Sequence, residues 1–255
     1  MPYKVTYTKA VPSTYRRKTY AKKKKVYKSR SQGQQQRAFA PTTGGTSVGR
    51  TQLQTVPLFP VRKYVKGQLY YEPNLGITTS IGNQGIYNFS ANGIFDPNRT
   101  GTGHQPLGFD QMMLMYEQFC VIRSHIKVTF LATDEPCRVA IMLSPDTNPA
   151  PSITAVMENG LMTTTSLIGS SAESGTHRMK TLQLACDVPK YFGKTYQSIL
   201  ADPLQSGTVS ADPGEQVYFQ IVVWDPYGAQ STSVALDVTI SYDVMYWEPK
   251  KLASS

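Results

Sequence analysis

The sequence predicts an all-β fold: an eight-stranded antiparallel sandwich of the jelly-roll type, preceded by a disordered or extended basic N-terminal arm. After residue 60, β-branched and aromatic runs follow one another, bounded by Gly, Pro, Asn and Asp. Runs with helical spacing are few and short. The first 37 residues are instead dominated by Lys and Arg. Strands without intervening helices favour a sandwich over an α/β fold.

The last strand has the clearest pattern. Between Val234 and Tyr246 every second residue is apolar, at seven successive positions, and the opposite face holds Asp237, Thr239, Ser241 and Asp243. This period of two predicts one buried and one exposed face. The run Cys120–Ala132 alternates in the same way. Its inward face is expected to hold Ile122, Ser124, Ile126, Val128 and Phe130, and its outward face Arg123, His125, Lys127 and Thr129.

The other expected strands are shorter and are separated by turn residues. They cover residues 61–71, 84–90, 137–143, 178–186 and 215–224. A weaker strand near 196–200 brings the count to about eight.

Two short helices are expected among the loops. Phe109–Phe119 has apolar residues at helical spacing, which favours a helix that covers one end of the sandwich over a cofactor site. Residues 152–159 form the second, with Ser152 as its N-cap.

The most basic segment is Tyr15–Arg30, which contains nine Lys or Arg residues among sixteen and no acidic residue. Like charges at this density, with little apolar surface, disfavour independent folding. Lys and Arg displace counterions from phosphates, and tyrosines offer faces on which unpaired bases stack. We therefore expect a nucleic-acid-binding arm rather than a tail that only improves solubility. The residues expected to bind are Arg16, Arg17, Lys18, Lys22, Lys23, Lys24, Lys25, Lys28 and Arg30, with Tyr15, Tyr20 and Tyr27.

Charge is unevenly divided along the chain. Residues 1–71 contain 16 Lys and Arg and no acidic residue, whereas the remaining 184 residues hold 10 basic and 17 acidic groups, a balance of 10 − 17 = −7. The polyanion is therefore expected on the arm, and its binding should weaken with salt. We predict an arm at 1–37, a linker at 38–60 rich in Pro, Thr, Gly and Gln, a jelly-roll domain at 61–249 and a tail at 250–255.

Three widely spaced cysteines, Cys120, Cys137 and Cys186, have no CxxC spacing and no secretory signal ahead of them. Three buried free thiols in a reducing compartment are therefore expected. No stretch approaches the ~18 apolar residues of a membrane span, so we expect no membrane insertion.

The sequence gives no positive sign of catalysis, and no metal or cofactor is expected. His104, His125 and His177 lack metal-binding spacing. Gly193-Lys194-Thr195 ends like a phosphate-binding loop, but Val188 stands where that motif requires glycine.

A longer run, SANGIFDPNRTGTGHQPLGFDQMMLMYEQFCVIRSHIKVTF at Ser90–Phe130, resembles the capsid proteins of circovirus-like viruses. These are small viruses with circular single-stranded DNA that encode a replication initiator. The most distinctive part is GTGHQPLGFDQ, and DVPKYFGK at Asp187–Lys194 is a second similarity. The basic arm and the aromatic closing strand extend the resemblance over nearly the whole chain.

This resemblance implies a capsid protein that assembles sixty copies into a T=1 icosahedral shell around circular single-stranded DNA, with non-specific RNA binding possible. It also implies that the arm is a nuclear localisation signal, read by host nuclear import receptors through Arg16, Arg17, Lys18 and Lys22, Lys23, Lys24, Lys25. The expected locations are the virion and the host nucleus. The host attachment factor is not identified.

Two other classes of protein fit parts of the sequence. One is a cellular nucleic-acid-binding structural protein with a basic tail, such as a ribosomal component. A ribosomal protein would be expected to have a basic face on its folded body, whereas the body of this chain is net negative. The other is a jelly-roll lectin or enzyme with an incidental tail, which would need a site.

Overall fold

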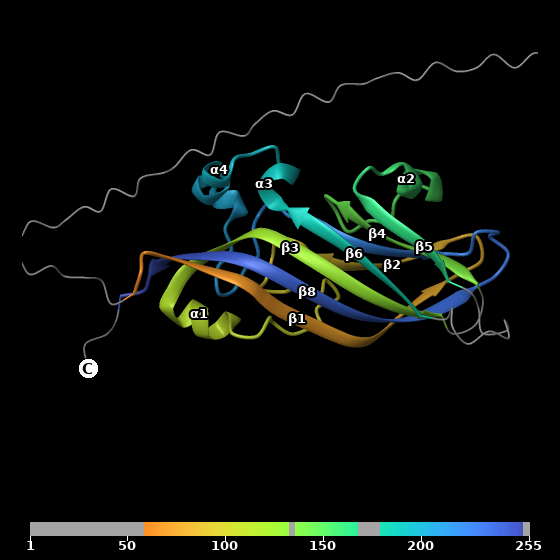
Figure 1. Ribbon diagram of the computed structural model, residues 1–255, viewed down its shortest axis with the longest axis horizontal. Coiled ribbons are helices and arrows are strands. Elements are labelled where there is room, and N and C mark those ends of the chain that lie inside the picture. Colours follow the sequence, from red (N-terminus) through yellow and green to blue (C-terminus); the bar gives the residue numbers. More distant parts are fainter. Residues whose placement is uncertain (1–58, 133–135, 168–178, 252–255) are drawn as a thin grey trace, which may run out of the picture. The chain divides into compact units, whose positions relative to one another are not determined.

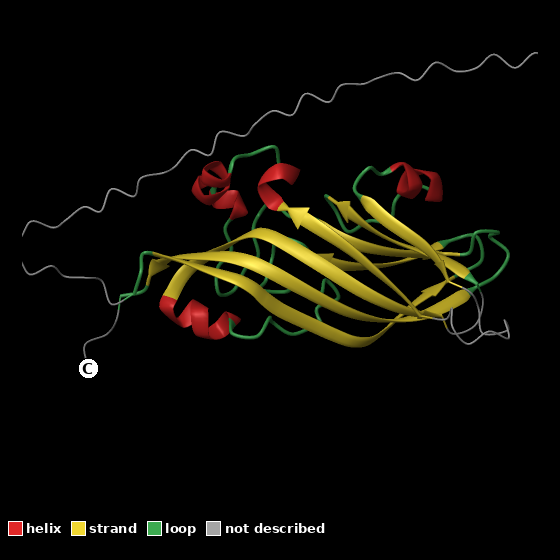
Figure 2. Ribbon diagram, viewed as in Figure 1, coloured by secondary structure: helices red, strands yellow, loops and turns green. Residues whose placement is uncertain are grey.

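Two four-stranded antiparallel sheets face each other in the computed structural model, which describes residues 59–132, 136–167 and 179–251 (Figures 1 and 2). The chain divides into two units, Met1–Leu53 and Gln54–Ser255, and all described residues belong to the second. The first sheet has the order β1 (Arg62–Thr79), β8 (Thr232–Pro249), β3 (Tyr116–Ala132), β6 (Met179–Asp187). The second sheet has the order β2 (Gln84–Ser90), β7 (Tyr218–Trp224), β4 (Cys137–Ser144), β5 (Met162–Leu167).

The strand pairing makes this sandwich a jelly roll. β1 pairs with β8, β2 with β7, β3 with β6 and β4 with β5, all antiparallel. These are the pairs of one long hairpin, and successive pairs alternate between the two sheets as the hairpin rolls up. The additional pairings β3–β8 and β4–β7 join the pairs within each sheet. The predicted eight-stranded jelly-roll sandwich is confirmed.

The helices occupy the long connections between strands. They are α1 (Phe109–Met115), α2 (Ile153–Glu158), α3 (Val188–Tyr191) and α4 (Tyr196–Ala201), followed by the 3₁₀ turn η1 (Pro203–Gln205). Ser152 caps α2 as predicted, because its hydroxyl accepts a hydrogen bond of 3.1 Å from the Ala155 amide.

The inward face of β8 supplies the centre of the core. All seven of its predicted inward residues are at most 2% exposed. On the neighbouring strand β3, Ser124, Ile126, Val128 and Phe130 are buried as predicted, but Ile122 is only partly buried. The β3–β8 register shifts between Val121 and Arg123, so an extra residue at this bulge displaces Ile122 and turns Val121 into the core.

A polar pair inside the core ties the two sheets together. Ser124 on β3 and Tyr242 on β8 are directly opposed in the first sheet. The Tyr242 hydroxyl donates to the Ser90 carbonyl at 2.8 Å, and the Ser124 hydroxyl donates to the Ala91 carbonyl at 2.6 Å. Both acceptors lie where β2 ends, so these buried hydrogen bonds fix how one sheet lies over the other.

β1 is longer than the predicted strand at 61–71 because two bulges carry it past Pro73. Its register against β8 shifts between Val65 and Gln68 and again between Glu72 and Leu75. Each bulge contains a residue with positive φ, Gly67 at 70° and Asn74 at 56°. Asp243 accepts from the Gly67 amide at 3.0 Å, and Asp237 accepts from the Asn74 amide at 2.9 Å. Two carboxylates of β8 thus stabilise the two bulges of its neighbour.

Two predicted elements are wrong in kind or extent. Residues 196–200 form helix α4 rather than a weak strand, because the Thr195 hydroxyl accepts from the Ser198 amide and caps a turn. The eighth strand is instead β5, whose sequence MTTTSL lacks an apolar alternation. The predicted helix 109–119 ends at Met115, since Tyr116 is extended and already pairs with Pro249 of β8.

We predict that Tyr242→Phe and Ser124→Ala each lower the free energy of unfolding by about 1–3 kcal/mol, because each deletes a buried hydrogen bond between the sheets. Urea denaturation of the subunit measures this. Tyr227→Phe is the control, because Tyr227 is 87% exposed. Losses no larger than that of the control would show that the pair does not hold the sheets together, and the double variant should be non-additive.

Candidate functional site

The twelve arm residues predicted to bind nucleic acid, between Tyr15 and Arg30, lie outside the described residues. Their role, and that of the seven assigned to nuclear localisation, stays a prediction. The structure does describe the part of the chain that follows the arm.

The described chain begins and ends at the same end of the first sheet. Arg62 at the start of β1 pairs with Trp247 near the end of β8. Exposed or half-exposed cations gather here, and Glu117 and Glu248 lie among them. The cations are Arg62, Lys63, Lys66, Lys250 and Lys251. This end of a body whose sequence is acidic overall therefore carries local positive charge.

A cavity of about 370 Å³ lies between α4 and the start of β1, and we call it the α4–β1 pocket. Its lining residues are Arg62, Tyr196, Gln197, Leu200 and Ala201. α4 is held in place by its capping residue Thr195 and by the fully buried Ile199. Figure 1 shows α4 near the end of the first sheet at which β1 begins.

One tyrosine, Tyr196, lines this pocket, and a second, Tyr64, lies nearby on β1. Tyr196 is 42% exposed and Tyr64, two residues after Arg62 on β1, is 47% exposed. Burial raises the pKa of Tyr196, and the nearby Arg62 charge opposes that shift. Burial also raises the pKa of Tyr64, with further contributions from Asp243 and Tyr196. Tyr196 therefore lies close to both Arg62 and Tyr64, and we call these three residues the tyrosine and arginine cluster.

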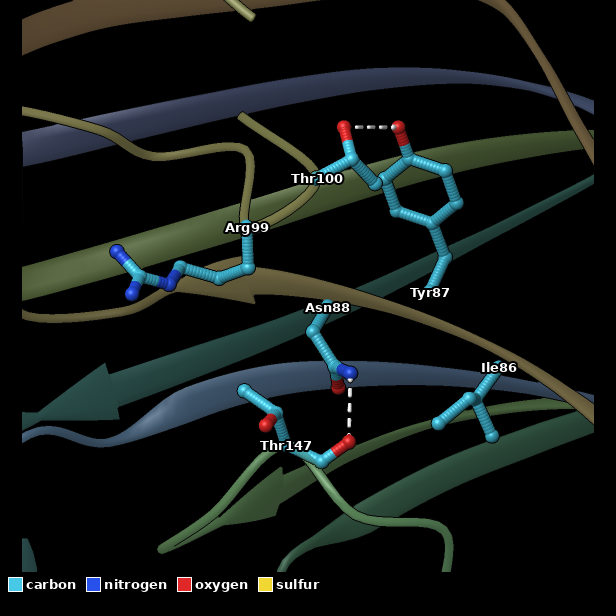
Figure 3. A pocket seen from close by; sticks show the side chains of 6 residues that line it. All are labelled: Ile86, Tyr87, Asn88, Arg99, Thr100 and Thr147. Atoms are coloured by element: carbon cyan, nitrogen blue, oxygen red, sulfur yellow. Dashed lines mark hydrogen bonds between the residues drawn. The ribbon is translucent and has the colours of Figure 1, made fainter. Parts of the chain in front are cut away.

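A second cavity, of about 320 Å³, lies along β2 (Figure 3) and is lined by Ile86, Tyr87, Asn88, Arg99, Thr100 and Thr147. Its polar groups already have partners. The Asn88 amide donates to the Thr147 carbonyl at 2.9 Å, and the Tyr87 hydroxyl lies 3.5 Å from the Thr100 hydroxyl. Arg99 points away from Tyr87 in Figure 3 and forms a salt bridge of 3.2 Å with Asp212. These contacts make the cavity a structural feature of the loops.

The segment Gly193-Lys194-Thr195 has a structural role. Lys194 forms salt bridges with Asp202 at 2.6 Å and with Glu215 at 3.2 Å. The two carboxylates come from the two ends of the connection after α4, so the lysine fastens that connection. Thr195 caps α4. Lys194 therefore binds carboxylates of this chain, whereas the lysine of a phosphate-binding loop binds phosphate.

His104 fastens the connection between β2 and α1 onto the edge of β1. Its Nδ1 lies 2.8 Å from the Gln105 carbonyl and its Nε2 lies 2.8 Å from the Tyr71 carbonyl. A neutral imidazole has one N–H, so only the imidazolium can donate to both oxygens. The carbonyls of Gln105 and Tyr71 raise the pKa of His104, and Glu72 raises it further, although burial opposes the shift. The ring also lies 4.7 Å from the ring of Tyr70.

The three cysteines are buried and free, as predicted. Burial raises the pKa of Cys137 to about 11 and those of Cys120 and Cys186 to about 12. Thiolates are the reactive form, so these residues act as small apolar core side chains.

Within the described ranges, no group of three or more His, Cys, Asp or Glu residues is arranged to hold a metal ion. No helix in the described part of the chain is long and apolar enough to cross a membrane.

No protein-family model matches the sequence, and no curated protein matches it. Three solved viral structures are among those to which the chain is similar. Desmodium yellow mottle tymovirus matches with a TM-score of 0.37 and 16% identity over 80% of this chain and 97% of that chain. Cocksfoot mottle virus matches with a TM-score of 0.42 and 11% identity over 74% of this chain and 96% of that chain. The T=3 nodavirus of Penaeus vannamei matches with a TM-score of 0.46 and 9% identity over 84% of this chain and 61% of that chain.

Sequence reasoning missed both the tyrosine and arginine cluster and the contacts of His104. The sequence placed Arg62 and Tyr64 in a strand, as observed, but it also placed Tyr196 in a strand, whereas the structure has helix α4 there. A capping threonine followed by Tyr196, Ile199 and Leu200 at helical spacing was the available signal for α4.

We predict that the stabilisation due to His104 depends on pH. Its folded pKa is raised, so the contribution is fully present below the ordinary value of about 6.5 and is lost as the pH rises through the folded pKa. His104→Gln should therefore lower Tm by up to about 2–4 °C at acidic pH and by less at alkaline pH. Thermal unfolding across a pH series measures this, with His125→Gln on the outward face of β3 as the control. A Tm difference that does not change with pH would contradict the assignment.

Proposed function

We propose that this chain is a viral capsid protein that packages nucleic acid through its N-terminal arm. The observation that carries the proposal is the separation of charge on a jelly-roll body. Residues 1–37 contain 12 Lys or Arg and no acidic residue, whereas residues 72–255 have a formal balance of −7. A polyanion is therefore attracted to one segment, and the folded body is left for contacts between protein subunits.

The jelly roll suits such a role because its two sheets form a rigid block whose loops tolerate variation. The Ser124–Tyr242 pair and the clamps on β1 stabilise this block internally. The connections that carry α1, α2 and α4 lie outside the sheets and expose apolar side chains such as Leu107, Leu114 and Met157. Such side chains are available for contacts with neighbouring copies.

The particular shell proposed is a T=1 icosahedron of sixty copies around circular single-stranded DNA. The resemblance of Ser90–Phe130 to circovirus-like capsid proteins supports this form. Its most distinctive part, Gly101–Gln111, forms the connection that His104 fastens to β1 and the start of α1. Sixty copies with 16 charges each supply 960 positive charges, on the order of half the phosphates of a ~2,000-nucleotide strand.

The same arm is proposed to direct the protein to the host nucleus. Import receptors would read the clusters Arg16–Lys18 and Lys22–Lys25, which also bind nucleic acid. The two uses are compatible because one precedes the other: a free arm is available to the receptor, and a packaged arm is covered by nucleic acid. The protein would then be found in the nucleus and in the virion.

We predict that the purified full chain assembles into closed particles. Sixty chains of 28.3 kDa would give a particle of about 1.7 MDa. Size-exclusion chromatography with light scattering measures the mass, and negative-stain microscopy shows the shape. A stable monomer under all assembly conditions would contradict the capsid proposal and favour a cellular nucleic-acid-binding protein.

We also predict that deletion of residues 1–37 leaves the jelly roll folded and removes most of the nucleic acid that co-purifies with it, because 12 of the 16 cationic side chains before residue 72 are lost. The ratio of absorbance at 260 and 280 nm and extraction of bound nucleic acid measure retention. A matched control replaces Lys22–Lys25 with glutamine in the full chain and should show a smaller loss. Equal retention by the deleted and full chains would show that the arm is not the binding segment.

A further inference from the structure

The α4–β1 pocket has features that the capsid proposal leaves unused. It is lined by the half-exposed phenol ring of Tyr196 and by Arg62, and the half-exposed Tyr64 lies near Tyr196 on β1. Tyr196 belongs to α4 and Arg62 to β1, so the two elements place a ring and a cation at the same cavity. Aromatic rings with this partial exposure are the platforms on which unpaired bases stack, and a neighbouring cation suits the phosphate of the same nucleotide.

The local charge also fits an anionic ligand. Arg62 and Lys63 form no salt bridge within the described part of the chain. Two nearby carboxylates already have partners: Asp243 accepts from the Gly67 amide at 3.0 Å, and Glu248 accepts from the side-chain amide of Gln118 at 2.8 Å. Arg62 is therefore available to bind an external phosphate.

The size and lining of the pocket fit a planar, partly polar group. A cavity of about 370 Å³ lies within the range of about 300–1,000 Å³ that is usual for small-ligand pockets. Leu200 and Ala201 give it an apolar wall, and Gln197 offers an amide that can donate to and accept from the edge of a base. One adaptable amide gives little sequence selectivity, as expected for packaging of a whole genome.

We propose that the α4–β1 pocket binds an unpaired nucleobase of single-stranded nucleic acid, stacked on Tyr196, with Arg62 on the adjoining phosphate. This inference rests on the proposed packaging function, and it gives the folded body a binding site of its own. The site includes Arg62, the first residue of β1, which is joined to the arm through the linker predicted at residues 38–60. Nucleic acid held by the arm is thereby kept at high local concentration near the pocket.

Photo-crosslinking of the full chain tests the proposal. A single-stranded DNA oligonucleotide with 5-iodouracil in place of thymine is bound, irradiated and digested, and the modified peptides are identified by mass spectrometry. We expect adducts on Tyr196 in addition to the arm. Adducts confined to the arm would overturn the pocket and leave the proposed function intact. An oligonucleotide that does not bind the full chain at all would overturn both.

Affinity measurements on full-length variants give an independent test. They are made in ~0.5 M salt, where contacts of the arm with phosphate are weakened and stacking persists. Tyr196→Ala, which helix α4 tolerates, should weaken binding of the oligonucleotide about fivefold or more, and Tyr196→Phe, which keeps the ring, should restore it. Tyr227→Ala removes a tyrosine that is 87% exposed on the loop between β7 and β8 and is the control. An equal effect of Tyr196→Ala and Tyr227→Ala on affinity would overturn the proposal. The proposal would also be overturned if assembled particles gave no adducts at the pocket because a second protein copy occupies it.

Discussion

The sandwich depends on β8, the last strand of the chain, lying between β1 and β3. Until β8 pairs, the first sheet has no centre, because β1 and β3 do not contact each other through a ladder. Each face of β8 then has its own task. The inward face carries Tyr242, which reaches the other sheet, and the outward face carries Asp237 and Asp243, which stabilise the two bulges of β1. Pairings such as Ile77 with Val234 join residues far apart in sequence, and forming such non-local contacts requires the closure of long loops.

The sequence predicted the fold where the pattern of side chains repeats, and failed where a local interaction breaks the repeat. The seven inward residues of β8 obey a period of two because one face is core and the other is solvent. Ile122 departs from that period because a bulge adds one residue to β3. The pattern of residue types in the sequence does not show where such a bulge occurs. Residues 196–200 looked like a strand because Tyr, Ile and Leu have high β-propensity, but the Thr195 cap and the burial of Ile199 favour a helix. β5 was missed because its threonines satisfy neither pattern.

The candidate sites differ in the same way. The arm is visible in sequence because its chemistry is concentrated in sixteen consecutive residues, and charge density needs no fold to be recognised. The α4–β1 pocket is invisible in sequence because Arg62 and Tyr196 lie on separate elements, and only the position of α4 beside the start of β1 brings them together. His104 illustrates the intermediate case. It belongs to the distinctive segment Gly101–Gln111, yet its role depends on a carbonyl of β1 that the sequence does not associate with it.

Under the proposed function, these two kinds of site would divide the work of packaging by their response to salt. Phosphate contacts of the arm release counterions and therefore weaken as salt rises, whereas stacking on a tyrosine ring depends little on salt. An arm alone would hold a genome by long-range attraction without fixing any nucleotide relative to the shell. A pocket on the rigid sheet fixes a nucleotide relative to β1, and so relative to every copy of the body in a symmetric particle. The arm would gather the strand, and the pocket would align it with the symmetry of the shell.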